Sequence, residues 1–221
     1  MKLDVPYIKQ EKNMCGPSSL QQVLEYYGRK ISLKDILANV KMFPFGTPPP
    51  YLAIGAKKLG YKVRLISFDV NYVDPSWKNS PKNEIIEKLK KRLPTIKNRI
   101  INRRTKGLIM ALESGVELDI KIPSEKILIK YMKRGIPPII TLSYNVLHDY
   151  KRKLNDKLDD VKGLPTGHYV VVSGYDDNNF IVTDPFNGTL KVPKRKLLFS
   201  WFFLGGWILI VEPKKIKWVK K

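Results

Sequence analysis

The chain has 221 residues, with 41 lysine and arginine residues against 20 aspartate and glutamate residues and a formal net charge of +21. Its 43% of hydrophobic residues is enough for one sizeable core, which excludes a wholly disordered chain. A single cysteine excludes an internal disulfide and a cysteine-rich metal site, so we expect neither a metal nor another cofactor.

Helices are predicted for the N-terminal part of the chain. Apolar residues recur at helical spacing over 15–28, and Ser32 is placed to cap a short helical segment. A further helix is expected at about 50–59, followed by a strand at 61–68.

Beyond that strand, the range of about 69–123 is predicted to be a basic helical insertion, which Pro94 divides in two. Its apolar lining is expected to consist of Ile85, Ile86, Leu89, Ile96, Ile100, Leu108 and Leu112. Strict alternation over 116–122 predicts a half-buried strand at its end.

Strands dominate the remainder of the predicted fold. Ser124 is expected to cap one more helix, which ends at Gly135, and apolar runs then alternate with turns, apart from a charged loop at 148–163. The apolar run 197–211 has 15 residues, too few to cross a bilayer as a helix, and we expect a hydrophobic turn and a buried final strand there. Helices first and strands later indicate one α+β domain over 1–221.

The cellular location follows from the same lack of long apolar segments. The N-terminal run 1–6 lacks the apolar stretch of a signal peptide. We therefore expect a cytoplasmic protein whose one thiol stays reduced.

The only cysteine, Cys15, stands at the predicted start of the first helix. A thiol there meets the positive end of the helix dipole and unpaired N–H groups, both of which lower its pKa and favour the nucleophilic thiolate. A buried structural cysteine is the alternative that the position alone leaves open.

His168 opens one apolar strand and Asp184 ends the next, with a hairpin loop at 175–179 between them. A hairpin places the start of one strand beside the end of the next, so Asp184 is expected to orient the His168 imidazole. Separately, each residue has an ordinary interpretation, a structural histidine and an Asp-Pro turn. With Cys15, the pair supplies the nucleophile, base and orienting group of a papain-like thiol enzyme. Gln10 would add a side-chain N–H to an oxyanion hole, beside the backbone N–H of Cys15.

The residues around these positions resemble the double-glycine, or bacteriocin-processing, peptidases of the papain-like superfamily. The segment 5–28, with VPYIKQ, CGPSSL and YYG, is similar to the N-terminal signature of that family, and 167–185 is similar to its second signature. The resemblance implies a papain-like fold, in which N-terminal helices carrying the nucleophile pack against an antiparallel sheet carrying His and Asp. The implied roles are nucleophile for Cys15, general base and acid for His168, orienting group for Asp184 and oxyanion-hole donor for Gln10.

We therefore predict a cysteine peptidase that cleaves a polypeptide substrate through a thioester acyl-enzyme, and transfer of the acyl group to an amine would use the same residues. Unlike many members of the family, the chain shows no membrane span and no phosphate loop. The basic helical piece at 76–114 and the loop at 148–163 are expected to overhang the cleft. The run Leu204-Gly205-Gly206 is interpreted as a turn, since cleavage there would remove a core strand.

Most of the excess charge lies outside the segments with these residues. Residues 76–106 carry 11 basic and 2 acidic side chains, and residues 191–221 carry 9 and 1. Nucleic-acid binding through these stretches is an alternative function, although only Trp77 and Trp218 accompany them as stacking residues. A non-catalytic peptide-binding papain-like module is another alternative, and an anionic membrane surface is a further partner that the charge suits.

Overall fold

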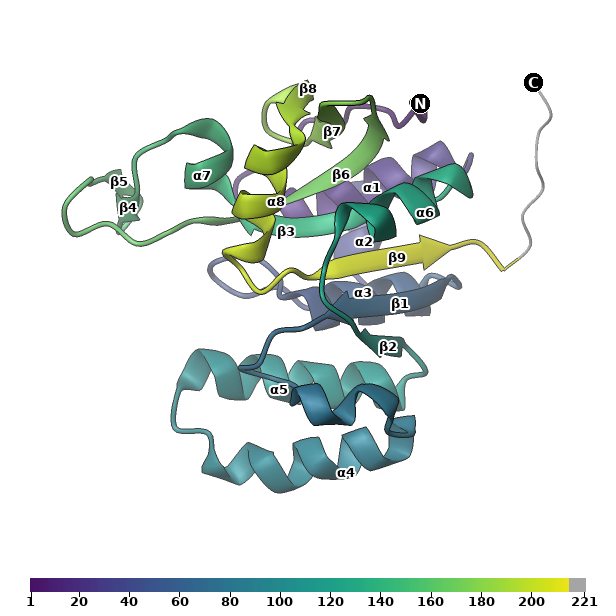
Figure 1. Ribbon diagram of the computed structural model, residues 1–221, viewed down its shortest axis with the longest axis vertical. Coiled ribbons are helices and arrows are strands. Elements are labelled where there is room, and N and C mark those ends of the chain that lie inside the picture. The colour runs from purple at the N-terminus through teal and green to yellow at the C-terminus, as the bar shows by residue number, and fades with distance from the viewer. Residues whose placement is uncertain (215–221) are drawn as a thin grey trace.

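The computed structural model describes residues 1–214, and a seven-stranded sheet forms its centre (Figure 1). The strand order is β2-β1-β9-β3-β6-β7-β8, in which β1 (Lys62–Ser67) and β2 (Glu117–Ile120) are parallel and all other neighbours are antiparallel. The other strands are β3 (Ile139–Ser143), β6 (Gly167–Tyr175), β7 (Asn179–Asp184), β8 (Gly188–Pro193) and β9 (Ile208–Glu212). The predicted α+β class is confirmed, and Trp218 lies outside the described residues.

Helices cover both faces of the sheet (Figure 1). One face carries α1 (Cys15–Tyr26) and α3 (Pro49–Lys58), and the other carries α6 (Glu125–Lys133) and α8 (Lys194–Phe202). Two short helices, α2 (Leu33–Leu37) and α7 (Tyr144–His148), complete this part of the fold. In residues 1–214, no helix combines the length and the apolarity that crossing a membrane requires.

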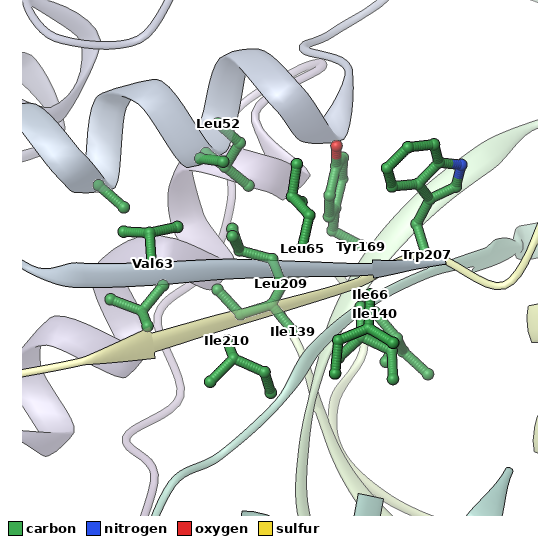
Figure 2. Packing of buried hydrophobic residues seen from close by; sticks show 14 of the residues in the cluster. Leu52, Val63, Leu65, Ile66, Ile139, Ile140, Tyr169, Trp207, Leu209 and Ile210 are labelled. Carbon is green, nitrogen blue, oxygen red and sulfur yellow. The ribbon is translucent and has the colours of Figure 1, made fainter. Parts of the chain in front are cut away.

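Neighbouring residues of β1 show how the sheet separates two apolar layers. In Figure 2, Leu65 points toward Leu52 of α3, whereas Ile66 lies on the opposite side with Ile140. All four side chains are buried. Successive side chains of a strand point to opposite faces, so a central strand that is covered on both faces needs apolar residues at consecutive positions. The continuous apolar runs from which the strands were predicted therefore arise because helices cover both faces of the sheet.

The segment 69–123 contributes helices and one edge strand. The elements are η1 (Pro75–Asn79), α4 (Lys82–Arg92), η2 (Leu93–Thr95), α5 (Arg99–Glu113) and β2. The α4–α5 pair lies beyond the β2 edge of the sheet, and Pro94 separates the two helices as predicted (Figure 1). The hydroxyl of Tyr51 in α3 donates to the carbonyl of Arg103 in α5 at 3.2 Å, so the segment packs onto the N-terminal helices.

Two local expectations were wrong, and that for Ser124 was only partly right. Ile100 is 60% exposed, because the buried face of α5 lies toward its C-terminal half. Ser124 is the N-cap of α6, but its side chain makes no capping hydrogen bond. The first part of 197–211 is the helix α8, with Trp201 fully buried, and only the Gly205–Gly206 turn and β9 follow as expected. Apolar residues on both the buried and the exposed side of α8 hide its helical spacing.

The predicted charged loop 148–163 contains a small hairpin of β4 (Lys153–Leu154) and β5 (Lys157–Leu158). Asp156 at its turn forms an exposed ion pair with Lys12, with 2.8 Å between nitrogen and oxygen. Lys12 precedes Cys15 by three residues. The hairpin therefore connects the end of α7 with the segment that leads into α1.

The turn before β9 provides a test of close packing. Gly205 has a φ of +79°, and a Cβ there would overlap the carboxylate of Asp69. Gly188 has a similar φ of +86° with open space around it. We expect Gly205→Ala to lower the free energy of unfolding by about 2–5 kcal/mol, the sum of left-handed strain and overpacking. Gly188→Ala is the control and carries only the strain, about 1–2 kcal/mol.

The measurement is urea unfolding of the two variants and the parent protein. Equal losses in both variants would contradict the close contact between Gly205 and Asp69.

Candidate active site

Cys15 is the first residue of α1, as predicted, and it is partly buried. Met14 occupies the N-cap without a side-chain capping bond, so the first N–H groups of the helix stay open to the thiol. Gly16 brings the helix onto the sheet, since a Cβ there would lie 3.2 Å from the ring of Tyr169 in β6. This approach sets Cys15 against the strand that carries His168.

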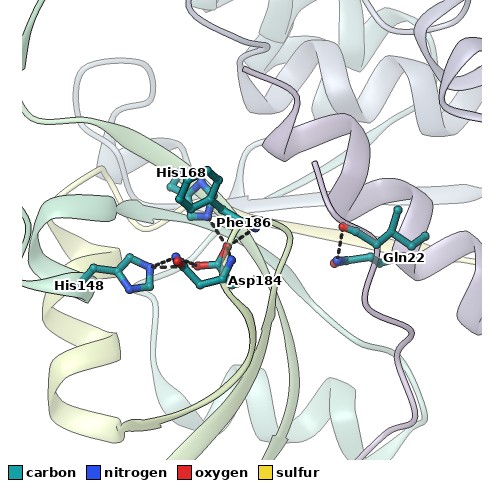
Figure 3. A network of polar contacts seen from close by, with 7 residues as sticks. Gln22, His148, His168, Asp184 and Phe186 are labelled. Carbon is teal, nitrogen blue, oxygen red and sulfur yellow. Dashed lines mark hydrogen bonds and ion pairs between the residues drawn. The ribbon is translucent and has the colours of Figure 1, made fainter. Parts of the chain in front are cut away.

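His168 and Asp184 contact each other directly (Figure 3). Nε2 of His168 lies 2.8 Å from Oδ1 of Asp184, and the two side chains are 6% and 0% exposed. The pairing of β6 with β7 places Val171 opposite Thr183, which leaves Asp184 diagonally across from His168. The hairpin predicted from the sequence therefore brings the two residues together.

The electrostatics of Cys15 and His168 are coupled. Burial disfavours the thiolate, but a hydrogen bond and charge interaction with His168, together with the N–H groups of Tyr169 and Gly16, lower the pKa of the Cys15 thiol. Burial likewise disfavours the imidazolium, yet Asp184 and Cys15 raise the pKa of His168 from 6.5 to about 9. The thiolate of Cys15 and the imidazolium of His168 therefore stabilise each other.

Asp184 is a buried carboxylate with several hydrogen-bond donors. Burial opposes its charge, but hydrogen bonds from His148 and His168, the charge of His168 and the N–H of Phe186 hold the pKa of Asp184 well below its usual range. The backbone N–H of Phe186 donates to Oδ1 at 2.7 Å. The orienting group is thus anionic and fixed in place when His168 carries its proton.

Gln10 lies near the same end of β7. Its backbone N–H donates to the carbonyl of Pro185, the residue after Asp184, at 2.8 Å. Its half-buried side chain has a buried Oε1 without a hydrogen-bond partner among residues 1–214. This amide oxygen is therefore not used by the described fold, and the oxyanion-hole role of Gln10 stays a prediction.

Sequence reasoning missed His148, Asn187 and Tyr144, which complete the surroundings of Asp184. Nε2 of His148 lies 3.0 Å from Oδ2 of Asp184, and Nδ2 of Asn187 donates to the same oxygen at 3.2 Å (Figure 3). The ring of Tyr144 stands edge-on to His168, with centroids 5.3 Å apart. A usable signal was that His148 is one of only two histidines in the chain.

The arrangement brings together a thiol of lowered pKa, a buried imidazole and the open N–H groups of a helix start. In the part of the chain from 1 to 214, no group of three or more histidine, cysteine, aspartate or glutamate side chains could hold a metal ion. A cysteine-bearing helix that packs on an antiparallel sheet bearing histidine and aspartate is the plan of the papain-like fold.

The Peptidase_C39-like family matches residues 2–104 and 114–206, and the chain belongs to this family of cysteine peptidases. No curated protein sequence matches it.

Several solved structures share the fold. A double-glycine motif protease from an AMS/PCAT transporter, in complex with its leader peptide, is 19% identical with a TM-score of 0.52, over 96% of this chain and 94% of the other. The peptidase domain of Streptococcus ComA is 18% identical with a TM-score of 0.50, over 94% and 97%. A C39-like peptidase from Bacillus anthracis is 17% identical with a TM-score of 0.50, over 98% and 100%. The expected papain-like fold is confirmed.

The lowered pKa of Cys15 predicts its reactivity. A thiolate persists to lower pH when the thiol pKa falls, so iodoacetamide should alkylate folded Cys15 at pH 6 about tenfold faster for each pKa unit of lowering than the thiol of the unfolded chain. Asp184→Asn should remove most of this excess, because a neutral amide stabilises the imidazolium less. Mass spectrometry of the alkylated protein measures both rates, and the urea-unfolded chain is the reference. A folded thiol that titrates like the unfolded one would contradict the ion pair.

Proposed function

We propose that the protein is a papain-like cysteine peptidase that cleaves a peptide bond through a thioester acyl-enzyme. The observation that carries the proposal is the buried contact of His168 with Asp184, beside a thiol at the start of α1 whose pKa His168 lowers. A cysteine with a purely structural role needs no such partner. Burial alone would raise its thiol pKa, whereas the pKa of the Cys15 thiol is lowered.

In the first half of the reaction, the Cys15 thiolate attacks the carbonyl carbon of the scissile bond and a C–S bond forms. The negative charge moves to the carbonyl oxygen, where the backbone N–H of Cys15 and the side-chain N–H of Gln10 stabilise it. The His168 imidazolium then gives its proton to the departing amine as the C–N bond breaks. Asp184 holds the ring in orientation throughout this transfer.

In the second half, neutral His168 takes a proton from water, and the oxygen of that water attacks the thioester carbonyl. The C–S bond breaks, the thiolate leaves, and the thiolate–imidazolium pair is restored. A substrate amine in place of water would give acyl transfer, with the same residues in the same roles.

Two further points support a polypeptide substrate. The chain belongs to a peptidase family, and one structure that shares its fold holds a leader peptide. We also propose that the segment 69–123 is an insertion in one papain-like domain, and that the protein acts in the cytoplasm, where the thiol stays reduced.

Loss of the nucleophile tests the proposal. Cys15→Ala should abolish cleavage of a diverse peptide library, because the remaining side chains offer no thiolate at this position. Mass spectrometry of the library before and after incubation detects new termini. Lys9→Ala, at an exposed position in the same N-terminal segment, is the matched control and should cleave like the parent. Cleavage that survives Cys15→Ala would rule out the proposed nucleophile.

Gln10 has its own expected effect. Gln10→Ala should lower kcat by about 100- to 1,000-fold, the usual cost of one oxyanion-hole donor, and leave KM nearly unchanged. The measurement uses a peptide that the library identifies as cleaved. An unchanged kcat would remove Gln10 from the mechanism and leave Cys15 and His168 in place.

A further inference from the structure

A second histidine contacts the carboxylate that orients His168. Oδ1 of Asp184 faces His168 at 2.8 Å, while Oδ2 faces Nε2 of His148 at 3.0 Å. His148 is the last residue of α7, and its side chain is 16% exposed. The proposed mechanism assigns no role to it, although Figure 3 shows Asp184 lying between the two imidazoles.

The surrounding contacts indicate which atom is the donor between Nε2 of His148 and Oδ2 of Asp184. Nδ2 of Asn187 lies 3.1 Å from Nε2 of His148 and 3.2 Å from Oδ2 of Asp184. If Nε2 of His148 had no hydrogen, its lone pair would face the carboxylate oxygen at 3.0 Å, a repulsive contact with an anion. The arrangement is therefore satisfied when His148 Nε2–H donates to Oδ2 and Asn187 donates to the same oxygen.

One aromatic side chain, Tyr144, contacts both histidines. The ring of Tyr144 lies 4.4 Å from that of His148 and 5.3 Å from that of His168, between centroids. Tyr150 and Phe186 meet the Tyr144 ring edge-on at 5.6 and 6.0 Å. Both imidazoles therefore pack against the half-buried ring of Tyr144, whose outer neighbours Tyr150 and Phe186 are exposed.

The charged groups next to His148 come from two other parts of the fold. Asp184 faces it from the end of β7. Lys196 of α8 pairs with Asp149, the residue that follows His148 in the chain. Neither member of this pair contacts the His148 ring, so Asp184 is the one charged group that does so among the described residues.

We propose that His148 is a positioning residue of the active site. It donates Nε2–H to Oδ2 of Asp184 and so fixes the carboxylate plane with Oδ1 directed at His168. The fixed carboxylate in turn stabilises the imidazolium that pairs with the Cys15 thiolate. The inference rests on the proposed function, because it concerns the same ion pair.

The pH dependence of Cys15 alkylation tests this role without a known substrate. Iodoacetamide rates are measured from pH 5 to 10 for the parent, His148→Ala and His148→Gln. In His148→Ala the thiolate should form about half to one pH unit higher, so that the rate at pH 6 falls about three- to tenfold. His148→Gln should stay within about twofold of the parent, since its amide N–H donates from a similar place.

Two more variants separate positioning from simple stability. His148→Phe keeps a ring against Tyr144 but lacks the donor, so it should shift the profile like His148→Ala even if the alanine variant folds poorly. Lys196→Ala removes the neighbouring ion pair without touching Asp184 and should leave the profile unchanged. Circular dichroism melting of each variant identifies the folded ones.

The outcomes are distinct. A folded His148→Phe or His148→Ala with the parent profile overturns the positioning role and leaves the proposed function intact. So does a glutamine variant that shifts as far as the phenylalanine variant. A parent protein whose Cys15 titrates like a free thiol overturns the proposed function, and the inference with it.

Discussion

A carboxylate with no exposed surface needs compensation for its charge, and Asp184 is such a group. Its two oxygens receive hydrogen bonds from His168, His148, Asn187 and the backbone of Phe186. These donors belong to β6, to α7 and to the turn after β7, so three parts of the chain must meet at one point. The constraint that makes Asp184 stable is the same one that sets the His168 ring toward Cys15.

The large positive charge contributes little to this chemistry. The pKa of Cys15 responds to His168 and to nearby N–H groups, which act over a few ångströms in a buried site. Helices α4 and α5, which carry many of the basic side chains, lie beyond the β2 edge of the sheet, and charges in water are screened within about 8–10 Å at ordinary salt concentrations. The charge bears on which surfaces the protein meets, whereas the contacts of His168 with Cys15 and with Asp184 bear on its reactivity.

Local sequence patterns predicted most of the fold, because each of these elements is specified by one clear feature of the sequence. The helix at Cys15 follows from the spacing of its apolar residues, and the division between α4 and α5 follows from Pro94. The β6–β7 hairpin follows from the turn residues between its strands. The helix α8 was missed because its exposed face is apolar as well.

His148 was missed for a different reason, because its contact with Asp184 depends on how α7 turns after β3. The pairing of Ser143 with Gly167 brings that turn beside His168, and this is a long-range register that one sequence does not encode visibly. The candidate triad was predictable since each of its members sits at the end of a recognisable element.

The place of β9 in the sheet bears on how the protein is made. Strand β9 lies between β1 and β3, so until Glu212 has been synthesised the sheet consists of two separate pieces, β2–β1 and β3–β6–β7–β8. Cys15, His168 and Asp184 all leave the ribosome before the strand that joins those pieces. At 5–20 residues per second, the 28 residues from Asp184 to Glu212 take about 1–6 s. A nascent chain therefore carries its complete set of candidate catalytic residues for seconds before the scaffold that aligns them can close.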